Sequence, residues 1–134
     1  MISRRVLLAI PGLGLLFGQE KKIAPAFEMT TYVIGLARKG PAFGTGTKEE
    51  NDRMMQAHMA HILRMHAEGK LITAGPITDN GDLRGIFVFR GSSPDEVRPL
   101  IDDDPTVKSG HLQVDLHPWY AAAGLRVNDP KPAC

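Results

Sequence analysis

His58 is the residue of this sequence whose type and position best suit acid–base chemistry. It lies within the apolar face of a predicted helix, so its imidazole is expected to be partly removed from water. With a polar or charged partner, such a histidine can act as a general base or acid. The alternative is a structural histidine that bonds to a backbone carbonyl in the core. The apolar neighbours at helical spacing are Met54, Met55, Ile62 and Met65.

Histidines could instead bind a metal ion. His58 and His61 are three residues apart on the same predicted helix, and His111 or His117 could supply a third ligand. A site of three histidines is chemically reasonable for zinc. The helix motif of zinc proteases, however, spaces its histidines four apart with a glutamate between them, and this sequence lacks it. We therefore predict no metal and no organic cofactor, with a histidine metal site as the rival interpretation.

Other patterns of catalysis and binding find little support in the sequence. No Ser–His–Asp or Cys–His arrangement is recognisable, and the single cysteine, Cys134, is the final residue. One cysteine excludes an internal disulfide and four-cysteine zinc sites. The glycines from Gly40 to Gly46 lack the Lys-Ser/Thr ending of a phosphate-binding loop. The formal net charge is +1 without a basic block, so nothing indicates binding to nucleic acid or an anionic membrane surface.

Two helices are expected to position these side chains. Thr47 begins the first as its N-cap, Glu50 takes the capping-box position, and Gly69 ends the helix. Ser93 with Glu96 forms a second capping box before a shorter helix. The predicted ranges are residues 48–68 and about 94–101.

Four strands complete the pattern. Each is rich in β-branched or aromatic residues, or alternates apolar and polar side chains. Gly75-Pro76 is expected to end the second strand, and Pro118 the fourth. The alternation in the third strand places Phe87 and Val88 on opposite faces of the sheet. The predicted ranges are residues 29–37, 71–74, 83–90 and 111–117.

The order strand, helix, strand, strand, helix, strand predicts an α+β domain with a ferredoxin-like βαββαβ fold. In that fold an antiparallel sheet carries two helices on one face. The 134 residues, 43% hydrophobic and 23% charged, suit one such domain. No third layer covers the second face of the sheet. We therefore predict a homodimer that packs sheet on sheet.

The N-terminal segment is typical of a secretory signal peptide. A basic start at Arg4-Arg5 precedes an apolar stretch from Val6 to Phe17, too short for a bilayer span of about 20 residues. We predict an exported protein that is periplasmic or extracellular and has no stable membrane span after signal removal. The alternative is an uncleaved anchor or a misassigned start codon. The predicted divisions are signal peptide and linker at residues 1–26, one domain at 27–127 and a flexible tail at 128–134.

Several motifs, in order along the chain, resemble the YciI-like, or YCII-related, domain family. In the longest, His58 on the helix is followed by Glu68-Gly69-Lys70-Leu71 and by Ala74-Gly75-Pro76. Together the motifs cover about residues 30–120. The others are Lys39-Gly40-Pro41, Asp104-Pro105-Thr106-Val107-Lys108-Ser109-Gly110 and His117-Pro118-Trp119.

The resemblance implies a dimeric α+β barrel-like fold and a histidine–aspartate pair in a pocket, here His58 and Asp104. Asp104 is preferred over Asp102 and Asp103 because it alone matches the motif; a plain solvated acid at a turn is the alternative. One branch of the family is dehydrochlorinase-like and acts on a chlorinated hydroxyhydroquinone. That substrate does not carry over to an exported chain.

The predicted function is a small enzyme in which His58 and Asp104 provide acid–base chemistry for elimination, isomerisation or hydrolysis of a small molecule. Arg84 could hold an anionic substrate, Gly75-Pro76 could shape the turn beneath the pocket, and Trp119 could line its rim. For Arg84 and Trp119, plain exposure and packing are the alternatives. The rival functions are a dimeric ligand-binding protein without catalysis and a histidine-based metal-binding protein.

Overall fold

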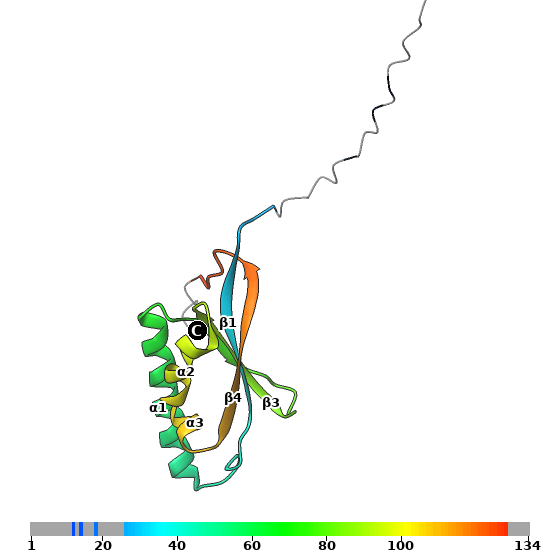
Figure 1. Ribbon diagram of the computed structural model, residues 1–134. Coiled ribbons are helices and arrows are strands. Elements are labelled where there is room, and N and C mark those ends of the chain that lie inside the picture. Colours follow the sequence, from blue (N-terminus) through cyan, green and yellow to red (C-terminus); the bar gives the residue numbers. More distant parts are fainter. Residues whose placement is uncertain (1–11, 13, 15–17, 19–25, 129–134) are drawn as a thin grey trace, which may run out of the picture.

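Within residues 26–128, four strands form one antiparallel sheet with helices on one face (Figure 1). The computed structural model describes residues 26–128 together with Gly12, Gly14 and Gly18. The sheet order β2-β3-β1-β4, with every neighbouring pair antiparallel, is ferredoxin-like. The predicted fold class is therefore confirmed. The elements are β1 Met29–Lys39, α1 Lys48–Ala67, β2 Leu71–Pro76, β3 Leu83–Arg90, α2 Pro94–Asp102, α3 Pro105–Lys108 and β4 Leu112–Ala122.

Helix α1 has the caps that the sequence predicts. The Thr47 hydroxyl accepts from the Glu50 N–H at 3.2 Å, and the Glu50 carboxylate accepts from the Thr47 N–H at 2.9 Å. Beyond the other end, Gly69 has a φ of 74°, which suits glycine because it has no Cβ. These caps fix the length of α1 and the position of the side chains that it carries.

Helix α2 begins differently from the prediction. Ser93 makes no side-chain hydrogen bond at the cap, so the predicted capping box of Ser93 with Glu96 is wrong. The Glu96 carboxylate accepts instead from the N–H and the hydroxyl of Ser92, at 2.9 and 3.1 Å. Ser92 rather than Ser93 presents its donors to the first turn. The Glu96 carboxylate therefore bonds to the residue before the predicted N-cap.

Two prolines that were expected to stop strands are themselves part of them. β2 continues through Gly75 and Pro76, and β4 continues past Pro118 to Ala122. Both are edge strands in the sheet. A proline on an edge strand can keep its nitrogen, which carries no hydrogen, away from the ladder, so pairing continues. The predicted ends of these two strands are therefore too early.

The two faces of the sheet carry different apolar clusters. Phe87 and Phe89 of β3 belong to the main core beneath the helices, where Met65 of α1 and Ile101 of α2 also pack. The opposite face, called the outer face below, carries a smaller cluster of Tyr32, Ile72 and Val88. Phe87 and Val88 thus face opposite sides, as predicted. Within residues 26–128 no helix or second sheet covers the outer face (Figure 1).

The predicted signal peptide and tail fall almost wholly outside the described residues. Of residues 1–26 only Gly12, Gly14, Gly18 and Ala26 are described, and of residues 128–134 only Asn128. No helix in the described part of the chain is both long enough and apolar enough to cross a membrane.

Candidate active site

Asp104 is set apart from its two acidic neighbours by the proline that follows it. Proline disfavours helical backbone in the preceding residue, and Asp104 is extended, with φ −67° and ψ 126°. Helix α2 therefore ends before Asp104, and the short helix α3 begins after it with Asp104 as its N-cap. Asp104 is 0% exposed, whereas Asp102 and Asp103 are exposed. The break between α2 and α3 thus turns one carboxylate of three into the interior.

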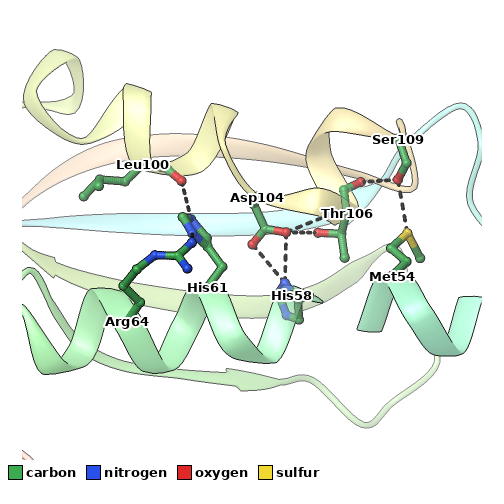
Figure 2. A network of polar contacts seen from close by, with 8 residues as sticks. All are labelled: Met54, His58, His61, Arg64, Leu100, Asp104, Thr106 and Ser109. Atoms are coloured by element: carbon green, nitrogen blue, oxygen red, sulfur yellow. Dashed lines mark hydrogen bonds and ion pairs between the residues drawn. The ribbon is translucent and has the colours of Figure 1, made fainter. Parts of the chain in front are cut away.

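The buried carboxylate of Asp104 meets His58 of α1 (Figure 2). The Nδ1 atom of His58 lies 2.9 Å from each carboxylate oxygen of Asp104. Because a carboxylate only accepts, Nδ1 carries the hydrogen and donates it. In the neutral ring Nε2 then holds the free lone pair, so Nε2 is the atom that can take a proton.

Three donors hold Asp104 in its charged form. Besides His58 Nδ1, they are the N–H of Thr106 at 2.9 Å and its hydroxyl at 2.7 Å. Burial raises the pKa of Asp104, but the hydrogen bonds from His58 and Thr106 outweigh it and leave the pKa below the ordinary value of 3.8. Asp104 is therefore a carboxylate at neutral pH. It can orient the His58 ring and stabilise the ring's protonated form.

His58 opens onto a cavity of about 280 Å³ between α1 and the sheet. Among residues 26–128 no buried side-chain polar atom lacks a hydrogen-bond partner. Nε2 of His58 makes no hydrogen bond with that part of the chain, so it is not one of the fully buried atoms. It is therefore open to the cavity that His58 lines. The Phe87 ring stands perpendicular to the imidazole, with 6.5 Å between ring centres. Apolar side chains dominate the lining, including Met55, Met59, Ile62, Ala74, Phe87 and Leu112.

This sequence matches the model of the YCII-related domain over residues 30–120. The chain belongs to the YCII-related domain family. No curated protein matches it. Among solved structures it is similar to 5-chloro-2-hydroxyhydroquinone dehydrochlorinase from Burkholderia phenoliruptrix AC1100 in complex with 2,5-dihydroxybenzoquinone. That likeness has 24% identity and a TM-score of 0.46, over 67% of this chain and 93% of the dehydrochlorinase.

Three of the four residues predicted to bind substrate line the cavity of this YCII-related domain: Arg84, Gly75 and Pro76. The fourth, Trp119, does not line it. Trp119 pairs with Tyr32 across β4 and β1, with 6.1 Å between the ring centres. Directly paired residues lie on the same face of a sheet, so Trp119 belongs to the outer face. The structure does not bring Trp119 to His58 within one chain.

The other histidines proposed as metal ligands do not converge on His58. His61 donates through Nε2 to the Leu100 carbonyl at 2.8 Å, while its Nδ1 accepts from Arg64 at 2.9 Å (Figure 2). His111 contacts the Ser109 hydroxyl at 2.7 Å, and His117 is exposed on β4. In the described part of the YCII-related domain, no three potential ligand side chains gather as a metal site would require. The geometry gives the alternative of a histidine metal site no support.

Thr106 is a neighbour of the His58–Asp104 pair that the sequence patterns did not single out. It supplies two of the three donors that bond to the Asp104 carboxylate. A signal was present in the motif Asp104-Pro105-Thr106, because an aspartate accepts readily from the backbone N–H two residues later. The threonine hydroxyl then has an acceptor within reach. The YCII-related domain thus orients its carboxylate with the same short segment that buries it.

Proposed function

We propose that this YCII-related domain is a small enzyme in which His58 moves a proton on a small molecule bound in the cavity. The buried His58–Asp104 pair carries the proposal, because its free nitrogen is open to a cavity of small-molecule size. When Nε2 takes a proton, the ring becomes positive, and the Asp104 carboxylate beside Nδ1 balances that charge. The pair therefore suits a general base that later returns the proton as an acid.

The lining of the cavity narrows the reaction class. The described residues that line it include no serine, threonine, cysteine or lysine, so among them His58 is the one candidate nucleophile for a covalent intermediate. Elimination and isomerisation need little more than a base and a group that holds the substrate. They fit this lining better than hydrolysis, which also needs a positioned water molecule.

The decisive experiment compares binding with turnover. A library of small molecules is first screened for an increase in melting temperature, since a ligand of the native state stabilises it. Candidate ligands are then tested for chemical conversion by the wild type and by His58→Gln. Conversion that depends on His58 supports the enzyme. Ligands that bind but are never converted would instead support a ligand-binding protein without catalysis.

We further propose that the domain forms a homodimer through its outer face. The apolar cluster of Tyr32, Ile72 and Val88 lies there, and Trp119 beside it is 40% exposed. Trp119→Glu is expected to weaken the dimer by about 2 kcal/mol or more, roughly 30-fold in Kd, because it places a charge in an apolar interface. Sedimentation velocity over a range of protein concentrations measures the change.

The matched control for the dimer is Leu63→Glu. Leu63 is also apolar and is 63% exposed, but it lies on α1, in the helix layer on the opposite side of the sheet. It should leave association unchanged. A wild-type chain that sediments as a monomer would contradict the dimer, and so would equal effects of the two substitutions.

Export to the periplasm or the medium is also proposed, and the basic and apolar segments before residue 18 support it. The expected result is a chain in the exported fraction whose mass lacks the N-terminal segment. Intact mass spectrometry of fractionated cells expressing the full sequence measures this. A full-length chain confined to the cytoplasm would contradict export.

A further inference from the structure

The cavity beside His58 carries one permanent charge, and it is positive. Of the residues that the structure describes, Arg84 of β3 and His58 are the only ionisable ones in its lining. Asp104 stands behind His58, is 0% exposed, and directs its oxygens to His58 and Thr106. Among the described residues, the lining therefore combines one arginine with no carboxylate side chain.

No side chain in the described region neutralises Arg84. None of the ion pairs found among residues 26–128 includes it. Its guanidinium donates one hydrogen bond, to the Gly81 carbonyl at 3.2 Å. The remaining donors of the guanidinium are available to an anion. A guanidinium next to apolar walls pairs more strongly with an anion than one in bulk water, because the local dielectric is lower.

Phe43 steadies this guanidinium. The Arg84 guanidinium carbon lies 5.8 Å from the centre of the Phe43 ring, and Lys39 Nζ lies 5.2 Å from the same centre. The face of an aromatic ring attracts cations. Phe43 thus restricts where the Arg84 head group can lie, although the phenylalanine itself is not part of the cavity lining.

The loop that carries Phe43 is itself anchored to the start of β4. The Gly40 N–H donates to the His111 carbonyl and the Ala42 N–H to the Gly110 carbonyl, each at 2.9 Å. A Cβ on Gly40 would collide with the Gly110 carbonyl, so the close approach requires glycine. Phe43 is therefore held by backbone contacts rather than by its own packing alone.

We propose that the cavity takes a small apolar monocarboxylate, whose carboxylate pairs with Arg84 while its hydrocarbon body fills the apolar walls. The inference rests on the proposed function, since it names the class of molecule on which His58 would act. One guanidinium fork matches one carboxylate in shape and charge. The volume of about 280 Å³ lies just below the usual range of ligand cavities, roughly 300–1,000 Å³, which favours a compact molecule.

Isothermal titration of the full chain with benzoate and with benzamide tests this inference. The two probes share a ring and differ in charge. Wild type is expected to bind benzoate about 10–100-fold more tightly than benzamide, because hydrogen bonds to charged groups are the stronger ones. Arg84→Gln should reduce that ratio to about one, and Phe43→Leu should reduce it severalfold by loosening the guanidinium.

Lys39→Gln is the matched control, because Lys39 contacts the same ring but does not line the cavity. It should keep the wild-type ratio. Circular dichroism checks that each variant is folded. If Arg84→Gln does not fold, Phe43→Leu still measures whether the ratio of benzoate to benzamide affinity depends on the guanidinium. Equal affinity for benzoate and benzamide in wild type would overturn the inference, as would a ratio that survives both substitutions.

Failure of the inference can be told apart from failure of the proposed function. His58→Gln removes the base but leaves Arg84 in place, so it should keep the preference for benzoate while losing conversion of any substrate. Loss of the carboxylate preference with His58-dependent conversion intact would contradict only the inference. Conversion that persists in His58→Gln would contradict only the acid–base role.

Discussion

Replacement of Asp104 by alanine is expected to lower the free energy of unfolding by about 3–5 kcal/mol, because three buried donors lose their acceptor at about 1–3 kcal/mol each. The side chain is 0% exposed. Its loss leaves the His58 Nδ1–H and both Thr106 donors without their acceptor. Small domains have unfolding free energies of about 5–15 kcal/mol, so the variant loses a large part of its stability. Urea unfolding followed by Trp119 fluorescence measures the loss.

Asp103→Ala is the matched control for this experiment. Asp103 is the adjacent aspartate, but its side chain is 70% exposed and lies 3.7 Å from Lys108 in a surface ion pair. Exposed pairs contribute little, so the change should stay within about 0.5 kcal/mol. Equal stability of the Asp103 and Asp104 variants would contradict the buried position of Asp104.

Asp104 should also make the stability depend on pH in the acid range. Its pKa in the folded protein lies below the ordinary value of 3.8, because hydrogen bonds from His58 and Thr106 outweigh the effect of burial. Between the two pKa values the unfolded chain binds more protons than the folded one. The stabilisation is therefore complete above the ordinary value and is lost as the pH falls through the folded pKa. Asp104→Asn, which cannot titrate, should show a flatter decline in melting temperature from about pH 6 to about pH 2.

Replacement of His58 by glutamine is expected to lower kcat about 10²–10⁴-fold, the usual contribution of a positioned general acid or base. KM should change little, because glutamine keeps a similar size and the apolar walls and Arg84 remain. Stopped or continuous assays of the substrate found by screening give both constants. The loss should appear at every pH, since no other base lines the cavity within the described residues.

His66→Gln is the control for loss of a histidine from the same helix. His66 is exposed and contacts the Leu71 carbonyl at 3.0 Å, outside the cavity. Its replacement should leave kcat within a factor of about two, as for most surface changes. Wild-type turnover in His58→Gln would show that the His58–Asp104 pair is structural.

His58 illustrates what the sequence could predict about the site. An ionisable residue within an apolar helical stripe is unusual enough to be noticed from spacing alone. Its partner was not visible in that way, because Asp102, Asp103 and Asp104 have the same chemistry and differ only in backbone geometry. The family motif selected Asp104, and the structure supplies the physical reason in Pro105.

Pro76, Pro118 and Trp119 illustrate what the sequence could not predict. Whether a proline ends a strand depends on whether the strand is at the edge of its sheet, and that requires the order of pairing. The face of the sheet on which Trp119 lies also depends on pairing, because it follows from the register of Trp119 with Tyr32. The element order predicted the ferredoxin-like fold because it needs only periodicity and caps. Register and edges arise from contacts between distant segments.

Pro105 also affects how the domain can fold. A run of three aspartates at the end of a helix offers several choices of which carboxylate to direct inward, and a shift of one residue would bury Asp103 instead. The restriction that proline places on residue 104 is covalent, so it acts in the unfolded chain before any packing exists. Helix α2 is therefore stopped at one position from the outset. Pairing of His58 with Asp103 in place of Asp104 is disfavoured early in folding. A glycine or alanine at position 105 would restore that competition among the three aspartates.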